Sequence, residues 1–361
     1  MTEQRSSVLV TGARALAQRG ARSRAAAATD RSPPFGLGFS AQILQFVAPR
    51  VAALRRWVNL GAHRLMACII SGYRFTPEGP LLQLDDLSVT PTRRSFRPVR
   101  GRACTFSWCD TRYCTGFRDL ATRTSFPCPN KAQVTGKSDV CWSCEQRTGF
   151  NPSFYNVERS AISPEQQRYN LEKHVVYLAA FSLDTAKVGI TSEGRMHSRL
   201  REQGARRGVI IAHTADAYEA REHEAAIHEW LYLPEQIRSG RKLSLLSERF
   251  DGAAVSAFLE ALRQRAEQKL DLAPLSNPIM SFDSDYLGDH VLEPPLVDLS
   301  EVTPPMISGV GVGLVGDILV MREVDRQLAL ALKPVIGCAV EISDQVRPNV
   351  ARPAQQMGFS F

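Results

Sequence analysis

Four cysteines in the middle of the chain have the spacing of a metal site. Cys114, Cys128, Cys141 and Cys144 follow the pattern Cys-x13-Cys-x12-Cys-x2-Cys. Four thiolates satisfy the tetrahedral preference of Zn²⁺, and a Cys-x-x-Cys pair with two more distant ligands closes a site that has no open position. Such a site stabilises a fold and is not expected to catalyse a reaction. We therefore expect one structural zinc ion.

The Cys-x-x-Cys pair is predicted more firmly than its partners. Cys104 and Cys109 are further candidates for the ligand position that we assign to Cys114, so the fourth ligand stays open among these three. The alternative is a set of buried thiols without metal, but the pair lies among Trp, Ser and Glu and not in an apolar run. Cys68 and Cys338 have apolar neighbours and are expected in the core.

Two charged side chains occupy positions that helical periodicity turns inward. Glu224 falls in the apolar stripe of a helix expected at about 216–231, and Arg199 lies on the inward side of a helix expected at about 194–203. A buried charge requires a partner or a metal. One interpretation is a structural ion pair between the two. The other is a carboxylate for a divalent metal and a guanidinium for phosphate in one cleft.

A run of arginines before the cysteines is interleaved with aromatic residues. Arg93, Arg94 and Arg97 begin this run, and Phe96 lies among them. Arginines contact phosphates while aromatic rings stack on bases, so the stretch predicts a nucleic-acid-binding face. The alternative is a solvated strand face with ordinary core aromatics.

Charge is unevenly distributed along the chain. The net charge is +7, but residues 1–65 carry ten arginines against two acids, which is +8. Residues 271–361 carry twelve acids against five lysines or arginines, which is −7. Positive charge indicates an anionic partner only where it is localised, so the basic extension and the arginine run are the two candidates.

Composition bounds the class of protein. The 361 residues, 44% hydrophobic and 22% charged, are typical of a globular protein with two or three modest domains. No window has the roughly 20 uninterrupted apolar residues that a bilayer span needs. The first apolar run is too short for a secretory signal. We therefore expect a soluble cytoplasmic protein with no membrane partner, in which the cysteines stay reduced.

Five segments follow from the pattern of elements. Residues 1–65 read as a disordered or weakly helical basic extension, although a transit peptide or an upstream extension of the reading frame would look similar. Residues 66–103 form a β-hairpin segment and 104–172 the zinc-binding module. Residues 173–270 follow a β-β-α-β-α pattern, and 271–361 are β-rich, with strands that suggest a small terminal domain.

Local signals place several elements. Ser163, Pro164 and Gln166 supply a helix N-cap, a proline at the first helical position and a capping-box glutamine. A turn at 77–80 separates two strands. The other expected elements are strands at 175–178, 187–190 and 209–211, a helix at about 253–269, and C-terminal strands around 310–314 and 328–332.

Two motifs are rejected on spacing. Gly311, Gly313 and Gly316 match the dinucleotide fingerprint, but a strand-like segment follows where that fingerprint opens a helix. His223 and His228 lie five residues apart, so they diverge by about 140° on a helix and cannot share a metal as an i, i+4 pair does.

The residues after position 174 resemble the GIY-YIG nuclease module. Val175-Val176-Tyr177, Lys187-Val188-Gly189-Ile190-Thr191, Arg199 and Glu224 occur in its order and spacing. The resemblance implies that Tyr177 helps to activate the nucleophile, that Arg199 steadies the phosphate and that Glu224 binds the metal. Lys187 stands where the family has its second tyrosine, and a lysine binds phosphate but is a poor proton acceptor unless its pKa is lowered.

A closer likeness covers about residues 66–345. The stretches RYCTGF, CWSCEQRTGFNP and KVGITSEGRMHSRLREQGA are similar to an uncharacterised prokaryotic family, domain of unknown function 2797. This resemblance implies an α+β fold in which a cysteine zinc site precedes a GIY-YIG-like core and a β-rich tail follows. Some members have a second Cys-x-x-Cys where this chain has Ser125 and Cys128, so Cys114 would replace the missing ligand.

The leading hypothesis is a zinc-containing nucleic-acid-binding protein whose core is a divalent-metal-dependent phosphodiesterase or endonuclease, with Mg²⁺ or Mn²⁺ at Glu224. The alternative is a non-catalytic module that binds nucleic acid or protein. Lys187 favours the alternative, and an inward Arg199 and Glu224 favour the enzyme. The choice between DNA and RNA and the oligomeric state stay open.

Overall fold

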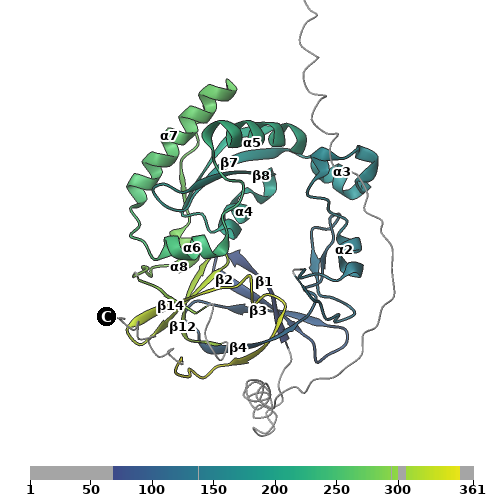
Figure 1. Ribbon diagram of the computed structural model, residues 1–361, viewed down its shortest axis with the longest axis vertical. Helices are drawn as coiled ribbons and strands as arrows, with labels where there is room; N and C mark the ends of the chain where they lie inside the picture. The colour runs from purple at the N-terminus through teal and green to yellow at the C-terminus, as the bar shows by residue number, and fades with distance from the viewer. Residues whose placement is uncertain (1–67, 137, 294, 300–305, 350–361) are drawn as a thin grey trace, which may run out of the picture. The chain divides into compact units, whose positions relative to one another are not determined.

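The computed structural model describes residues 68–136, 138–293, 295–299 and 306–349, so the expected basic extension over 1–65 lies outside the described residues. The described part is a mixed α+β protein (Figure 1). Its α-helices are α2 (Trp142–Thr148), α3 (Pro164–Asn170), α4 (Met196–Gln203), α5 (Ala217–Leu231), α6 (Ser239–Leu246), α7 (Gly252–Leu270) and α8 (Asp283–Leu287). Within this part, no helix combines the length and apolar character that crossing a bilayer requires.

A nine-stranded sheet, called the large sheet below, joins both ends of the described chain. Its strand order is β11-β14-β13-β12-β4-β15-β1-β2-β3. The strands are β1 (Cys68–Thr76), β2 (Gly79–Asp86), β3 (Arg93–Pro98), β4 (Ala103–Arg112), β11 (Val297–Asp298), β12 (Met306–Val315), β13 (Ile318–Glu323), β14 (Arg326–Ala331) and β15 (Cys338–Ser343). The expected hairpin is present, because β1 and β2 pair antiparallel around the turn at 77–80.

The C-terminal strands do not form a sheet of their own. Strand β15 lies between β4 and β1, and β12 pairs with β4. Alternating apolar residues on strands far apart in sequence therefore share one interior, which includes Cys68 and Cys338 as expected. Sequence periodicity shows which residues face inward, but it does not show which strands pair. The strands within residues 306–343 belong to the large sheet and do not form the separate terminal domain expected for residues 271–361.

The glycine-rich run in β12 is explained by close packing. A Cβ on Gly311 would overlap the backbone carbonyl of Val99, and a Cβ on Gly313 would overlap that of Tyr286. Both glycines lie within a strand. The run therefore permits close approach of neighbouring backbone and has no phosphate-binding turn, which agrees with the rejection of the dinucleotide fingerprint.

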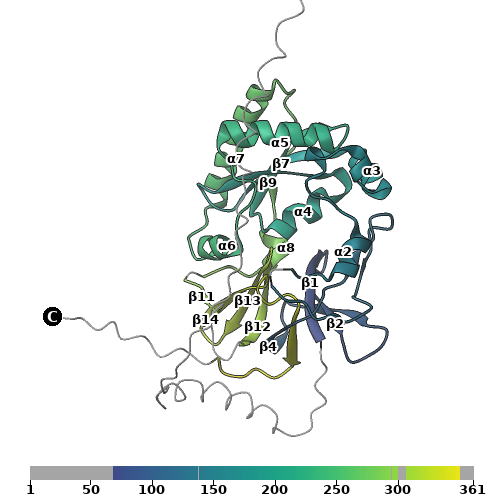
Figure 2. The same ribbon diagram turned by 45° about the vertical axis from the view of Figure 1, so that its right-hand side comes forward.

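Residues 174–270, called the α/β unit below, follow the expected β-β-α-β-α order. Strands β7 (His174–Ala180), β8 (Ala186–Ser192) and β9 (Arg207–Thr214) alternate with α4 and α5, and α6 and α7 follow. The small sheet has the order β10-β9-β7-β8, with β10 (Met280–Ser281) at one edge and β8 at the other. Figure 2 shows α5 and α7 lying along one face of this sheet.

Helix α5 begins where a side chain caps it. The Asp216 carboxylate accepts hydrogen bonds from the backbone N–H groups of Tyr218 and Glu219, and Asp251 caps α7 in the same way. The caps fix where each helix starts, and therefore which residues of α5 face the sheet. Those buried residues of α5 are Ala217, Ala220, Glu224, Ile227 and Leu231.

Strand β7 is buried on both faces. Val176 and Leu178 pack with residues of α5 and α7. Val175, Tyr177 and Ala179 pack on the opposite side, in a cluster with Leu200 of α4, Tyr286 of α8 and residues of the large sheet. Tyr177 is thus held inside the protein, on the face of the small sheet that α4 covers.

The cysteine-rich segment contains little regular secondary structure. It contains the two-stranded pair β5 (Phe117–Arg118) and β6 (Ser125–Phe126), then α2, two 3₁₀ turns at Phe154–Asn156 and Arg159–Ala161, and α3. The capping box predicted for α3 is confirmed in its first half, because the Ser163 hydroxyl accepts from the Gln166 N–H at 3.2 Å. A third 3₁₀ turn, Glu193–Arg195, leads into α4.

Candidate functional site

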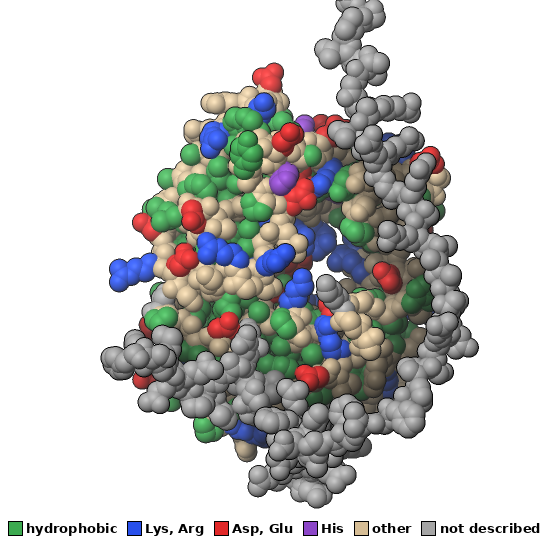
Figure 3. Space-filling model, in the orientation of Figure 1, with side chains coloured by type: hydrophobic (Ala, Val, Ile, Leu, Met, Phe, Trp, Pro, Cys, Tyr) green, Lys and Arg blue, Asp and Glu red, His purple; other side chains and the backbone are tan. Residues whose placement is uncertain are grey.

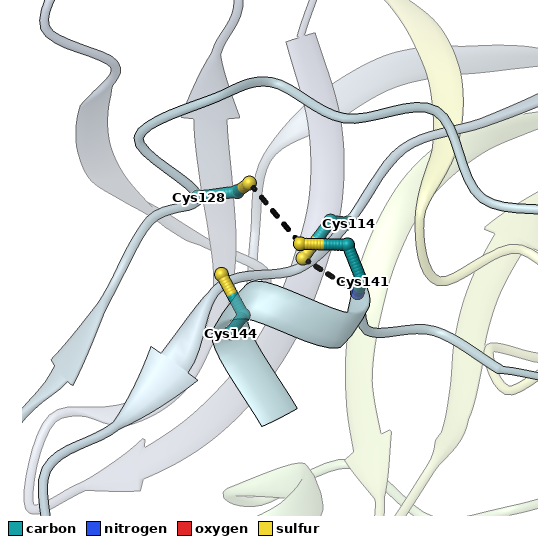
Figure 4. Close-up of side chains that lie close together, drawn as sticks. All are labelled: Cys114, Cys128, Cys141 and Cys144. Atoms are coloured by element: carbon teal, nitrogen blue, oxygen red, sulfur yellow. Dashed lines mark hydrogen bonds between the residues drawn. The ribbon is translucent and has the colours of Figure 1, made fainter. Parts of the chain in front are cut away.

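The four predicted cysteines converge in one cluster. Cys114 follows β4 and Cys128 follows β6, while Cys141 is the N-cap of α2 and Cys144 lies in its first turn. Figure 4 shows the four side chains pointing toward a common centre. Their sulfur atoms all lie within 4.8 Å of one another, so the four could hold one metal ion.

The geometry fits tetrahedral coordination. A metal–sulfur distance of about 2.3 Å places tetrahedral thiolates about 3.8 Å apart, and the Sγ atoms of Cys128 and Cys141 are 4.0 Å apart. The backbone N–H groups of Gly116 and Cys141 donate to the sulfur of Cys114 at 3.4 and 3.2 Å. Such donors stabilise the negative charge of a thiolate ligand.

The position left open by the sequence belongs to Cys114. Cys104 lies in the interior of the large sheet, and Cys109 is exposed. Burial raises the pKa of the Cys114 thiol to about 11, so without a cation this thiol stays protonated at neutral pH. A coordinating cation reverses this preference, because it deprotonates the thiols that bind it.

A second group of polar side chains gathers on the small sheet. Tyr177 and Gly189 are cross-strand partners in β7 and β8, and Lys187 lies two residues before Gly189, on the same face. The Lys187 Nζ donates to the backbone carbonyl of Glu235 at 2.7 Å and to the Gln203 side-chain oxygen at 3.3 Å. Lys187 is therefore buried, and neutral acceptors engage two of its three donors.

Arg199 approaches the same face from α4. Its side chain is 39% exposed, so it is less buried than the helical stripe suggested. The nearest carboxylate is that of Glu202, at 3.8 Å, and the same carboxylate pairs at 2.9 Å with Arg195. Arg199 thus has one long, shared ion pair and also interacts with the hydroxyl of Tyr177, which leaves further donors of its guanidinium available.

Glu224 has a different partner from the one expected. Its carboxylate accepts from Arg221, one turn earlier on α5, at 2.5 Å. Arg221 also pairs with Glu235 and contacts the Tyr155 hydroxyl. The i, i+3 spacing of Arg221 and Glu224 was visible in the sequence, so this structural partner could have been found there. The structure describes no ion pair between Glu224 and Arg199.

Electrostatic interactions link the four predicted residues. Burial raises the pKa of Tyr177, and nearby Arg199 opposes this while Glu224 adds to it. Burial and Arg199 lower the pKa of Lys187 to about 8, against the pull of Glu224. Burial raises the pKa of Glu224, although Arg221 opposes it. The structure therefore brings Tyr177, Lys187, Arg199 and Glu224 within the range of mutual charge interaction.

A cleft of about 910 Å³ begins beside this group. Arg199, Glu202 and Gln203 of α4 line one part of it, and Gln203 is also the acceptor for Lys187. Further cations on the lining are Arg238, Lys242 and Lys333, none of which the sequence pattern singled out. These three residues are not part of any local sequence pattern, so the sequence did not indicate that they line one cleft.

The three arginines of β3 differ in their surroundings. The Arg94 guanidinium makes a bidentate pair with Asp85, with both N–O distances at 2.7 Å, and Asp85 is only 1% exposed. Arg97 pairs with exposed Asp344 at the protein surface. Arg93 is exposed. Arg94 therefore has a structural role in the sheet, and only Arg93 and Arg97 present charge to solvent.

Comparison with known proteins gives a match to one protein family. The profile of the family described as "Protein of unknown function (DUF2797)" matches residues 101–322. The match covers more than half of the chain, and the protein belongs to this family. No curated protein and no solved structure matches the chain.

Proposed function

We propose that this protein binds nucleic acid and that the phosphates lie at the edge of the α/β unit where Lys187 of the edge strand β8 and Arg199 of α4 interact electrostatically with Glu224 of α5, beside buried Tyr177. The convergence of these four residues beside the 910 Å³ cleft carries the proposal. Buried, mutually perturbed ionisable groups at the edge of a cleft are typical of functional sites.

The order of elements supports a likeness to the GIY-YIG nuclease module. Strands β7, β8 and β9 with helices α4 and α5 follow the β-β-α-β-α order of that module. Tyr177 and Gly189 stand at its motif positions, and Arg199 and Glu224 lie on the two helices that the resemblance assigns to them. Lys187 in place of the second tyrosine is the departure.

Two observations favour binding over cleavage. Lys187, with a pKa of about 8, is mostly protonated at neutral pH, so it suits phosphate binding better than proton abstraction. Glu224 is already paired with Arg221. Among the described residues, the cysteines form the one group of three or more potential metal ligands, so a divalent ion at Glu224 would depend on phosphate oxygens for most of its ligands.

Cleavage by a Mg²⁺- or Mn²⁺-dependent phosphodiesterase is the second candidate. It is favoured by Glu224 itself, a buried carboxylate whose charge acts on Tyr177. In this function Glu224 would hold the metal and Arg199 would offset charge on the phosphate. Tyr177 would lie beside the nucleophile.

The cysteine cluster is proposed to hold zinc. All four ligands are sulfur, which selects Zn²⁺ over Mg²⁺ or Ca²⁺, and no ligand position is left for substrate. The ion would fix α2 against the β5–β6 pair, through Cys144 on the helix and Cys128 after β6. Its role is structural.

The test is a panel of fluorescently labelled single-stranded and duplex DNA and RNA, titrated with purified protein at several salt concentrations. We expect binding that weakens steeply with salt, with a log–log slope that reports the number of phosphates contacted. Each substrate is also incubated with Mg²⁺ or Mn²⁺ to detect cleavage. Absence of binding to every member of the panel at low salt contradicts the proposal.

A further inference from the structure

The cleft of about 910 Å³ lies between two parts of the fold. Residues 236–240, Lys242 and Leu243, which include the start of α6, and the end of α4 form one wall. Tyr73 of β1, Asp317 before β13, and residues 331–334 at the end of β14 form the other. In Figure 3, Lys and Arg side chains gather around the hollowed centre of the face shown.

The acids of the cleft are engaged, whereas several cations are not. Glu202 pairs with Arg195 at 2.9 Å, and Asp317 pairs with Lys242 at 3.0 Å. Asp298 also has a partner. Arg238 and Lys333 are exposed and, among the described residues, have no ion-pair partner. With Arg199 they give the cleft three cationic groups whose donors remain available, which is the arrangement that binds phosphate oxygens.

The walls of the cleft are held in place before any ligand arrives. Asp317 accepts from both Lys242 and the Ser239 hydroxyl, and so ties the first turn of α6 to the large sheet. At the end of α4, Gly204 lies against Gly316, where a Cβ on Gly316 would be 2.7 Å from the Gly204 Cα. Such close backbone contact needs two glycines. Rigid walls reduce the entropy cost of binding.

The size of the cleft restricts its ligand. A volume of 910 Å³ falls in the range of small-molecule sites, about 300–1,000 Å³. It can hold a few nucleotides of an extended strand, but it is too small to enclose a duplex, whose major groove alone is about 12 Å wide. A strand with exposed phosphates and separated bases therefore fits inside the cleft, whereas paired strands can only lie across its opening.

We propose that this cleft binds the phosphates of single-stranded nucleic acid, with Arg199, Arg238 and Lys333 as the phosphate ligands. The inference rests on the proposed function and adds the substrate class and the second wall of the site. Gln203 links the two, since it lines the cleft and accepts from buried Lys187. The strand would then pass from Lys333 and Arg238 toward Arg199.

Two cleft variants and two matched controls test the proposal. Arg238→Ala and Lys333→Ala remove exposed cations from the cleft, while Arg249→Ala and Arg322→Ala remove exposed cations outside its lining. Affinity for a labelled single-stranded oligonucleotide and for a blunt duplex is measured by anisotropy across a salt series. Thermal melting confirms that each variant is folded.

We expect each cleft variant to bind the single strand about fivefold more weakly, with a salt slope shallower by about 0.7, and each control to match the wild type. We also expect the wild type to prefer the single strand to the duplex. Equal losses of affinity in the cleft and control variants would overturn the inference, and so would a preference for the duplex. Either result would leave nucleic-acid binding itself intact. A wild type that binds no substrate overturns the proposed function itself.

Discussion

The hydroxyl of Tyr177 occupies the space that the side chain of any residue but glycine would need at position 189. A Cβ built on Gly189 would lie 2.5 Å from the Tyr177 hydroxyl and 2.6 Å from the ring carbon that carries it. The two residues are directly opposite each other in β7 and β8. Gly189, in the Lys187-Val188-Gly189 segment, has no side chain, and the Tyr177 ring packs across it. The glycine therefore determines where the Tyr177 ring lies.

Gly189→Ala is expected to displace the Tyr177 ring and to lower the free energy of unfolding by about 1–3 kcal/mol, the usual effect of overpacking a rigid core. Gly194→Ala is the matched control, because a Cβ at Gly194 meets open space. Urea denaturation measures both. If the two variants are equally stable, Tyr177 is not held as described.

The purified protein is expected to contain about one zinc ion per chain. Cys141→Ser and Cys144→Ser should each lose the metal and melt at lower temperature, because structural zinc contributes folding free energy on the order of 10 kcal/mol in small modules. Cys109→Ser, at an exposed cysteine outside the cluster, should keep both metal and stability. Elemental analysis and calorimetry check this. Metal-free protein with an unchanged melting temperature argues against a zinc site.

The lowered pKa of Lys187, about 8, makes stability depend on pH. An unfolded lysine titrates near 10.4, so between about pH 8 and 10.4 the unfolded chain binds more protons and the folded state gains stability as pH rises. Relative to Lys187→Met, the wild type should gain on the order of 3 kcal/mol across this window. Lys173→Met, at an exposed position, controls for the loss of charge. A difference that does not change with pH contradicts the lowered pKa.

Glu224→Gln is expected to cost little stability. Burial raises the pKa of Glu224 despite Arg221. Ionised Glu224 therefore lowers the free energy of unfolding, by an amount that grows as pH rises above the unfolded pKa near 4.3. In the variant, Arg221 keeps Glu235 as a partner. The variant should stay within about 1 kcal/mol of the wild type at neutral pH.

Asp85→Asn is the comparison for Glu224→Gln. It leaves buried Arg94 opposite a neutral group and should lose about 3 kcal/mol. A Glu224→Gln protein as unstable as Asp85→Asn would show that Glu224 is retained for the fold. If it is stable, its effect on metal-dependent cleavage decides between the two candidate functions.

Local sequence signals predicted most elements of this fold. The capping box at Ser163 and the helical pattern expected at about 216–231 placed the starts of α3 and α5 to within a residue. The spacing of Cys141 and Cys144 identified the four-cysteine cluster, because one turn of helix brings both sulfurs to one side. These signals act over a few residues, and tertiary contacts did not override them.

Long-range pairing could not be predicted in the same way. The insertion of β15 between β4 and β1 joins residues more than two hundred positions apart, and no local pattern encodes such a partner. The same reason hid the cleft, whose cations Arg238 and Lys333 come together only when α6 packs on the large sheet. The sequence also suggested Arg199 as the partner of Glu224, whereas Arg221 is nearer on the same helix.

The most direct test of a phosphate-binding face on the α/β unit compares Arg199→Ala with Arg265→Ala. Both remove one arginine, but Arg199 lines the cleft, whereas Arg265 lies on α7 beside Trp230. Measured as single-stranded nucleic-acid affinity across a salt series, Arg199→Ala should weaken binding about fivefold or more and flatten the slope by about 0.7, with Arg265→Ala unchanged. Equal effects of the two substitutions, with both proteins folded, would contradict the account.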